Sequence, residues 1–275
     1  AKKLGANNQT KSDQPLVAQG NIFQVYFSAI RESAACRQLI IAWCFLQLAL
    51  MFVMSSTPLY FKSFFPDLSR TPLTDQLDPI AINVFGVLLD GPKQVMVAQA
   101  LSQLATIVAT GFWMKLLAKK TLQTTWQFAC IAFALSLLVQ MIGPPVNNGQ
   151  FTSLLIFQIL VGGSMSAIFF LPMLAMARVS EQDTMATGKQ RASVFQGLCL
   201  FSLTASGALQ GYISGEVLEQ AGYDPDNHSE QATQAIGFLS VYLPSVLFVC
   251  SALAMFGFEA KTSDTKQKRS EIKLD

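Results

Sequence analysis

The chain has 275 residues, of which 51% are hydrophobic and 13% are Asp, Glu, Lys or Arg, whereas soluble domains average about 25% charged residues. Its formal net charge of +2 is too small to indicate a nucleic-acid partner. With one histidine, His228, and five cysteines that form no CxxC pair, the sequence indicates no metal centre.

The two ends of the chain are polar. Residues 1–20 predict a disordered lead-in, because they contain too few apolar side chains to form a core. Residues 259–275 mix basic and acidic side chains and predict a cytoplasmic tail. Residues 21–37 predict an amphipathic linker helix on the cytoplasmic membrane surface, since one helical face carries Ile22, Phe23, Tyr26, Phe27 and Ile30.

Between these ends, six windows contain no Asp, Glu, Lys, Arg or His. About 20 apolar residues are enough for a helix to cross the bilayer, and only helices and closed barrels satisfy their backbone there. The sequence therefore predicts an all-α membrane protein whose six-helix transmembrane bundle spans residues 38–258. The windows are Gln38–Tyr60, Gln94–Met114, Thr125–Gly143, Phe151–Ala177, Ala192–Gly215 and Ala235–Phe258.

The basic residues predict the orientation of the bundle. If residues 1–37 lie inside, the inner segments hold 16 of the 19 lysines and arginines, and only Lys62, Arg70 and Lys93 lie outside. An excess of basic residues marks the cytoplasmic side. We therefore expect an integral protein of a plasma membrane or bacterial inner membrane, with both termini in the cytoplasm.

Cysteine labelling in intact cells tests this orientation. A membrane-impermeant thiol reagent should label a cysteine introduced at Asn148 or Asp226, because both positions fall in predicted outer loops. It should not label a cysteine introduced at Ser270. Labelling at Ser270 would contradict the predicted topology.

Two short stretches interrupt the pattern of spans. Pro58, near the end of the first window, can kink or end the helix because proline removes a backbone donor. In the following loop, the apolar run IAINVFGVLL over residues 80–89 is too short to cross as a helix. It predicts either a short interfacial helix or a packed loop. Later, the charged sequence over residues 177–191 predicts a compact turn between the fourth and fifth spans.

Small residues in two spans predict close helix contacts. The fourth window contains Gly162 and Gly163, and small residues let helix backbones approach one another. The fifth carries Gly207, Gly211 and Gly215 four apart on one face, a doubled GxxxG pattern. The second pattern predicts that Gly211→Leu would disrupt assembly of the bundle.

Neutral polar residues are the candidates for contact with a solute. A stripe of Gln and Thr in the second window should face other helices or a cavity; its members are Gln99, Gln103, Thr106 and Thr110. In the fourth and fifth windows, the substrate-binding candidates are Gln158, Phe169, Phe170, Gln196 and Thr204. Their amides and hydroxyls could bind a hydroxyl-rich solute, or they could hold helices together at about 0.6–2 kcal/mol each. Packing is the stronger reading for the two phenylalanines.

The sequence contains no carboxylate pair, histidine cluster or glycine-rich phosphate loop within or near the spans. We therefore predict that the protein is not an enzyme, and we assign no catalytic residue, cofactor or metal ligand.

Four pieces of the sequence resemble the glycoside–pentoside–hexuronide cation symporters, the melibiose-permease branch of the major facilitator superfamily. They are LPMLAMARVSEQDTMATGKQR, VFQG, AGYDPDNHSEQATQAIG and VYLPSVLF. The matching positions are Ala177, Glu181, Asp183, Thr187, Gly188, Lys189, Arg191, Gly222, Tyr223, Gln231, Gln234, Gly237 and Pro244. The helix over residues 21–37 is similar to the linker that enters the seventh helix of this family.

The resemblance maps the chain onto the C-terminal six helices, which form half of a major facilitator superfamily fold. It implies a small polar, sugar-like solute carried by alternating access, and a coupling cation, sodium or proton, bound by acids in the N-terminal half. The chain departs from the family at Arg178, Ala192 and Thr204, where family members carry an acid, a glutamate and, in some cases, a lysine. The implied partners are an N-terminal six-helix half or a second membrane subunit, the lipid bilayer and the solute.

Two alternatives remain open from the sequence. The chain could be a membrane scaffold or assembly subunit that uses the same fold without transporting. It could also be a six-helix protein that dimerises into a complete carrier.

Overall fold

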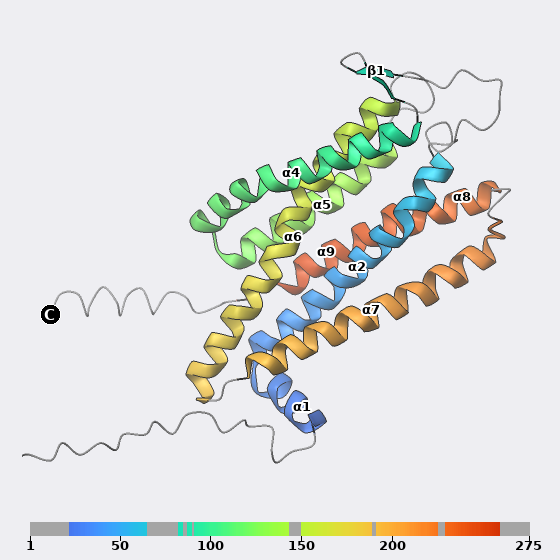
Figure 1. The fold of residues 1–275 in the computed structure, drawn as a ribbon. Helices are drawn as coiled ribbons and strands as arrows, with labels where there is room; N and C mark the ends of the chain where they lie inside the picture. The colour runs from blue at the N-terminus through green and yellow to red at the C-terminus, as the bar shows by residue number, and fades with distance from the viewer. Residues whose placement is uncertain are drawn as a thin grey trace, which may run out of the picture.

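The computed structural model describes residues 22–64, 82–84, 87–89, 91–142, 150–188, 191–224 and 229–258 (Figure 1). The predicted lead-in over residues 1–20 and the predicted tail over residues 259–275 lie outside these ranges. Within them, six helical segments are long and apolar enough to cross a membrane. The protein is therefore an all-α membrane protein with six transmembrane helices.

All six predicted windows coincide with these spans. Five of the spans are single helices, and the sixth is built of three consecutive segments. The single helices are α2 (Ala34–Phe64), α4 (Gly91–Lys119), α5 (Leu122–Ile142), α6 (Gln150–Thr187) and α7 (Ala192–Gln220). The sixth span consists of α8 (Glu230–Gly237), the π-helical turn η2 (Phe238–Tyr242) and α9 (Leu243–Ala254).

A short helix, α1 (Ile22–Glu32), precedes the first span. Ser33 separates the two helices, and its Oγ accepts the backbone N–H of Cys36 at 3.1 Å, as an N-terminal cap does. The Arg37 side chain donates to the carbonyl of Arg31 at 2.8 Å, at the other side of the junction. The helix predicted over residues 21–37 therefore ends at Glu32, because Ser33 starts a new helix.

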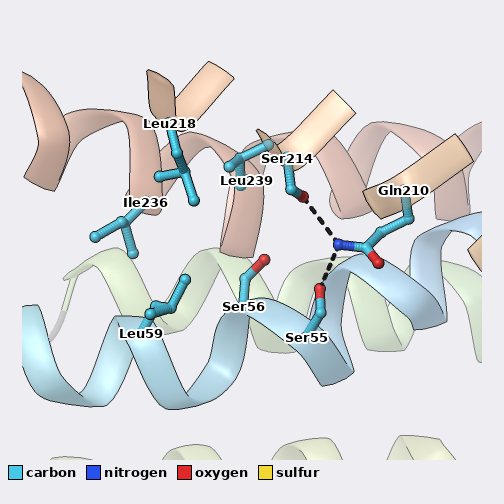
Figure 2. A pocket seen from close by; sticks show the side chains of 8 residues that line it. All are labelled: Ser55, Ser56, Leu59, Gln210, Ser214, Leu218, Ile236 and Leu239. Carbon is cyan, nitrogen blue, oxygen red and sulfur yellow. Dashed lines mark hydrogen bonds between the residues drawn. The ribbon is translucent and has the colours of Figure 1, made fainter. Parts of the chain in front are cut away.

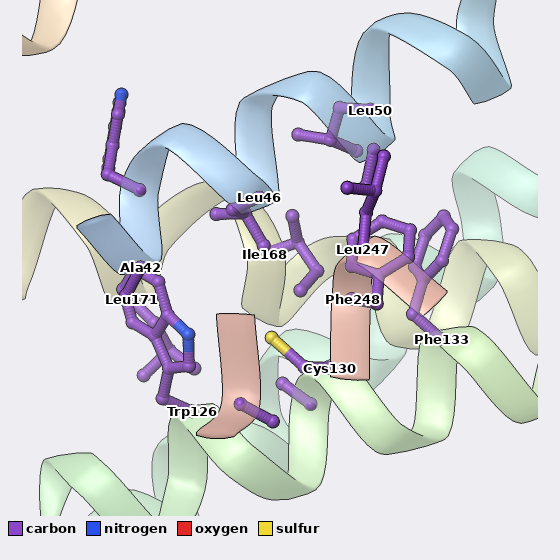
Figure 3. Packing of buried hydrophobic residues seen from close by; sticks show 14 of the residues in the cluster. Ala42, Leu46, Leu50, Trp126, Cys130, Phe133, Ile168, Leu171, Leu247 and Phe248 are labelled. Carbon is purple, nitrogen blue, oxygen red and sulfur yellow. The ribbon is translucent and has the colours of Figure 1, made fainter. Parts of the chain in front are cut away.

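The six spans pack around a core shared by α2, α5, α6 and α9 (Figure 3). The rings of Phe133 on α5 and Phe248 on α9 lie 4.5 Å apart between centroids. Ser251 of α9 joins three helices: its Oγ donates to the carbonyl of Ala42 at 2.8 Å and accepts the indole N–H of Trp126 at 3.1 Å. Ser251 therefore holds α9 against α2 and α5.

Helices α4 and α6 approach each other closely at Gly162. A Cβ atom at this position would lie 2.2 Å from the backbone oxygen of Ser102. The Thr106 hydroxyl donates to the Gly162 carbonyl at 2.9 Å, and the Trp113 indole donates to the Gly163 carbonyl at 2.7 Å. The contact predicted from the glycine pair in the fourth window is confirmed.

The described residues of the apolar run, 82–84 and 87–89, form two strands, so the prediction of a short helix or a packed loop is wrong there. Strands β1 (Ile82–Val84) and β2 (Val87–Leu89) pair antiparallel, with Ile82 opposite Leu89. The run is rich in Ile and Val, whose branched side chains favour strands, and in the sequence Gly86 precedes the second strand. The pairing of the two strands satisfies backbone hydrogen-bonding groups in a segment that is too short to cross the membrane as a helix.

The turn predicted over residues 177–191 is also corrected, because α6 continues to Thr187. The sequence from Ala177 to Thr187 contains no glycine or proline to stop the helix. Gly188 has a φ of 68°, and its N–H donates to the Thr184 carbonyl at 2.8 Å. A glycine in this left-handed conformation is a common helix terminator.

Prolines lie inside three of the spans: Pro58 in α2, Pro172 in α6 and Pro244 in the sixth span. Pro58 does not end α2, which continues to Phe64. In the sixth span, Pro244 has no N–H to donate to the Ser240 carbonyl four residues earlier. The N–H of Leu243 instead bonds to the Phe238 carbonyl, five residues back. The result is the π-helical turn η2, a feature that is frequent at functional sites.

Candidate functional site

The five substrate-binding candidates predicted from the sequence lie on two helices and do not gather around one cavity. On α6, Gln158 is buried and Phe170 packs against the core, whereas Phe169 is 56% exposed. On α7, Gln196 and Thr204 are exposed. The Thr204 hydroxyl donates to its own helix, at the Leu200 carbonyl. None of the five lines the cavity described below.

The polar stripe on α4 divides into two parts. Thr106 bonds across to α6, and Thr110 donates to the Thr106 carbonyl at 2.8 Å. Gln99 and Gln103 are exposed on the surface of the bundle. The stripe therefore faces another helix of this chain only at one end.

On the glycine face of α7, Gly211 and Gly215 have no other described helix against them, whereas Gly207 lies near α2. In the described part of the chain, no atom lies within 4 Å of a Cβ built at Gly211 or Gly215, and the first atom near Gly207 is the Met51 sulfur at 3.9 Å. The expected internal contact is therefore wrong, and so is the reason for expecting Gly211→Leu to break this bundle. The face is open because α7 packs mainly on α2 through other residues, which include Phe195, Cys199, Ser202 and Ser206.

Two of the six spans are much more open than the others. In an 18-residue apolar stretch of each span, 11% of α4 and 22% of α7 is buried inside the bundle. The corresponding share is 50–56% for the other four spans. Helices α4 and α7 lie at opposite edges of the bundle in Figure 1, with α6 and α2 between them. The exposed side chains on these two helices include amides and hydroxyls within the membrane-spanning segments.

A cavity of about 140 Å³ lies where α2, α7 and the start of the sixth span meet (Figure 2). Half of its lining side chains are polar and uncharged, and half are aliphatic. They are Ser55, Ser56 and Leu59 of α2, Gln210, Ser214 and Leu218 of α7, and Ile236 and Leu239 of the sixth span.

Gln210 is the centre of the polar side of this cavity. Its amide nitrogen donates to the Ser55 Oγ at 2.7 Å and to the Ser214 Oγ at 2.9 Å, which links α7 to α2. In the π-helical turn, the Ser240 hydroxyl donates to the Ile236 carbonyl of its own span at 2.7 Å and lies 3.4 Å from the Ser56 carbonyl of α2. Sequence reasoning missed these residues, although Gln210 stands between the two glycines Gly207 and Gly211 in a charge-free window.

A cluster of charged side chains joins α1 to the ends of α6 and α7. The Arg191 guanidinium lies 2.6 Å from Glu32 Oε2 and 4.0 Å from Asp183 Oδ2. The side chains of Arg191 and Asp183 are only 7% and 3% exposed. Nearby, Tyr26 of α1 packs against α7 at Gly197, where a Cβ would lie 2.4 Å from the tyrosine oxygen. This cluster fixes the short helix against the bundle.

The described residues include no group of three His, Cys, Asp or Glu side chains that could hold a metal ion. What the arrangement offers is uncharged hydrogen-bonding groups at membrane depth, on open helix faces and in one cavity. These groups can bind and release a neutral polar molecule, since they form hydrogen bonds without a charge to neutralise.

Comparison with known proteins identifies the family. The family model described as MFS/sugar transport protein matches residues 86–261, which is more than half of the chain and includes five of its six spans. No curated protein matches the chain. The six apolar helices agree with this match, since such carriers are built from bundles of six. The chain belongs to the MFS/sugar transport protein family and is an integral membrane transporter protein.

Proposed function

We propose that this chain is one six-helix half of a carrier that moves a small polar, sugar-like solute by cation-coupled alternating access. The second half would be another six-helix bundle, in the same or in a separate polypeptide. In carriers of this architecture, the two halves rock against each other around a site at their interface. The observation that carries the proposal is that the two open spans, α4 and α7, expose amides and hydroxyls among their apolar side chains.

The exposed positions of α7 and α9 differ in a way that lipid contact does not explain. On α9, the exposed large side chains Val246, Val249 and Leu253 are apolar, as suits hydrocarbon. On α7, Gln196 and Thr204 are exposed, and on α4 Gln99 and Gln103 are exposed. An amide in hydrocarbon without a hydrogen-bond partner costs several kcal/mol. A second protein surface or a water-filled path would satisfy these groups.

The open glycine face of α7 supports the same partner. Gly211 and Gly215 present backbone at the surface with no neighbour from the described part of this chain. Small residues at this spacing allow another helix to approach closely. A helix of the second bundle would therefore pack on α7, next to the exposed amides and hydroxyls that would contact the solute.

Coupling to a cation requires a group whose affinity for the ion differs between the two states of the carrier. Ionisable side chains within a membrane usually provide such groups, and the six predicted windows of this chain contain none. The proposal therefore places the ion-binding acids in the second bundle.

The same lack of charge favours a second candidate function, a membrane scaffold or assembly subunit. Such a subunit would use the open faces of α4 and α7 to bind another protein and would move no solute. Purification from native membranes separates the two. A carrier half should be recovered with a second six-span segment, and a scaffold with a larger complex that contains no such segment.

Reconstitution of this chain alone in liposomes tests the half-carrier proposal. We expect no gradient-driven accumulation of a radiolabelled sugar under an imposed sodium or proton gradient, because the coupling acids are absent. Helical circular dichroism and a cooperative thermal transition serve as controls that the protein is folded. Accumulation of the sugar against its gradient by the folded chain would show that no second bundle is needed.

A further inference from the structure

We propose that the cavity between α2, α7 and the sixth span is a binding site for a neutral polyol with a three-carbon skeleton. The assignment goes beyond the proposed function, because this cavity is separate from the exposed amides of α4 and α7, and it rests on that function only for the solute's transport. Binding itself is measured on the isolated chain, so failure of this site and failure of the half-carrier proposal can be told apart.

The chemistry of the lining selects a neutral ligand. None of the eight side chains that line the cavity carries a charge. A carboxylate or an ammonium group would lose its hydration without gaining a counter-charge, which is costly in a partly buried site. Serine hydroxyls and a glutamine amide both donate and accept hydrogen bonds, and they match the hydroxyl groups of a polyol.

The geometry of Gln210 orients these groups. Both of its amide hydrogens are used on Ser55 and Ser214, which hold the side chain across the gap between α7 and α2. The carbonyl oxygen lies on the other branch of the amide, as Figure 2 shows, and can accept from a ligand hydroxyl. Ser214 accepts from Gln210 while its own hydroxyl hydrogen can donate. A ligand with adjacent hydroxyl groups can therefore bond to both residues.

The remaining lining suits the carbon skeleton of such a molecule. Ile236 and Leu239 are almost fully buried and line the cavity together with Leu59 and Leu218. The C–H face of a polyol can pack on these aliphatic side chains while its hydroxyls point to Gln210 and the serines. Mixed sites of this kind, with an apolar wall and a few polar groups, are typical of small-molecule pockets.

The volume sets the size of the ligand. A protein cavity of about 150 Å³ holds one benzene molecule, and the cavity here is about 140 Å³. Glycerol has as many non-hydrogen atoms as benzene, whereas a hexose has twice as many. The cavity therefore has room for a three-carbon polyol but not for the whole of a hexose ring.

The test follows the Ile236 methyl resonance in isoleucine-methyl-labelled chain in detergent, assigned with the conservative variant Ile236→Val. Glycerol should shift this resonance saturably. Lactate and benzene have as many non-hydrogen atoms as glycerol, but lactate is charged and benzene has no hydroxyl groups. These two probes and glucose should cause no saturable shift.

Variants locate the binding. Gln210→Leu should weaken glycerol binding about tenfold, the effect of losing one hydrogen bond. Gln220→Leu makes the same substitution on the same helix at an exposed position, and should bind glycerol as the unmodified chain does. Ser214→Leu should abolish binding by filling the cavity, and it provides the test if Gln210→Leu does not fold.

Three results would overturn the assignment. A glycerol shift that rises linearly and equally in the Gln210→Leu and Gln220→Leu variants would be a solvent effect. A saturable shift with benzene but not with glycerol would show an apolar groove. A saturable shift with glucose or lactate equal to that with glycerol would contradict the size or the charge that the lining implies.

Discussion

Gly162→Ala should lower the stability of the bundle by about 1–3 kcal/mol, the usual cost of forcing extra atoms into a packed contact. The added methyl carbon would lie 2.2 Å from the Ser102 oxygen and 2.8 Å from the Ser102 carbonyl carbon. Both are backbone atoms, so no side chain can rotate to make room. Helices α4 and α6 would have to separate, which would also lengthen the 2.9 Å bond from Thr106 to the Gly162 carbonyl. Thermal unfolding in detergent measures the effect.

The adjacent glycine provides a matched control. A Cβ at Gly163 would lie 3.9 Å from the Ala109 Cβ, which is ordinary van der Waals contact. Gly163→Ala should therefore be neutral or slightly stabilising, since alanine favours a helix over glycine by about 1 kcal/mol. Equal losses for the two variants would mean that the α4–α6 contact is not centred on Gly162.

Arg191→Met should cost about 3–5 kcal/mol, because it would leave a buried carboxylate without its counter-charge. The Asp183 side chain is 3% exposed, and its Oδ2 has no hydrogen-bond partner among the described residues. The Arg191 guanidinium, 4.0 Å away, is the charge that compensates it. The same substitution would also remove the ion pair to Glu32, which helps to hold α1 against the bundle. The loss is measured by thermal unfolding in detergent, with α1 mobility followed by a spin label at exposed Phe27.

Two further variants show whether the loss of stability in Arg191→Met comes from the unpaired charge of Asp183. The double variant Asp183→Asn, Arg191→Met removes both buried charges and should recover a large part of the stability lost in Arg191→Met. Arg31→Met makes the same arginine substitution at an exposed position of α1 and should change stability by less than about 0.5 kcal/mol. If the double variant is as unstable as Arg191→Met, the loss comes from packing rather than from the unpaired Asp183.

The six spans could be predicted from the sequence because the bilayer excludes charge, and the charge-free windows are therefore direct evidence. The ends of the helices were less predictable. The charges near Asp183 suggested a turn, but the residues up to Thr187 lack a helix breaker and stay helical. A local pattern could have indicated the strand pair at Ile82–Leu89, since Ile82, Val84 and Val87 are β-branched residues that favour strands.

The pattern of small residues in the sequence does not predict which face of a helix packs against which neighbouring helix. Gly162 and Gly211 both belong to small-residue patterns, yet Gly162 touches α4 and Gly211 is open. The choice depends on how helices distant in the sequence pack, and on surfaces outside this bundle. The same holds for the cavity, because Ser55 and Gln210 are 155 residues apart and meet only through the packing of α2 on α7.

Photo-cross-linking in native membranes tests most directly whether the open faces of α4 and α7 bind a second bundle. Benzoylphenylalanine would replace Gln103 on α4 or Thr204 on α7, with Val246 on α9, an exposed apolar position, as the lipid-facing control. Mass spectrometry of the digested adducts then identifies what each position touches. The proposal predicts adducts with peptides of a second set of membrane helices from Gln103 and Thr204, and lipid adducts from Val246. Lipid adducts alone from all three positions would contradict it.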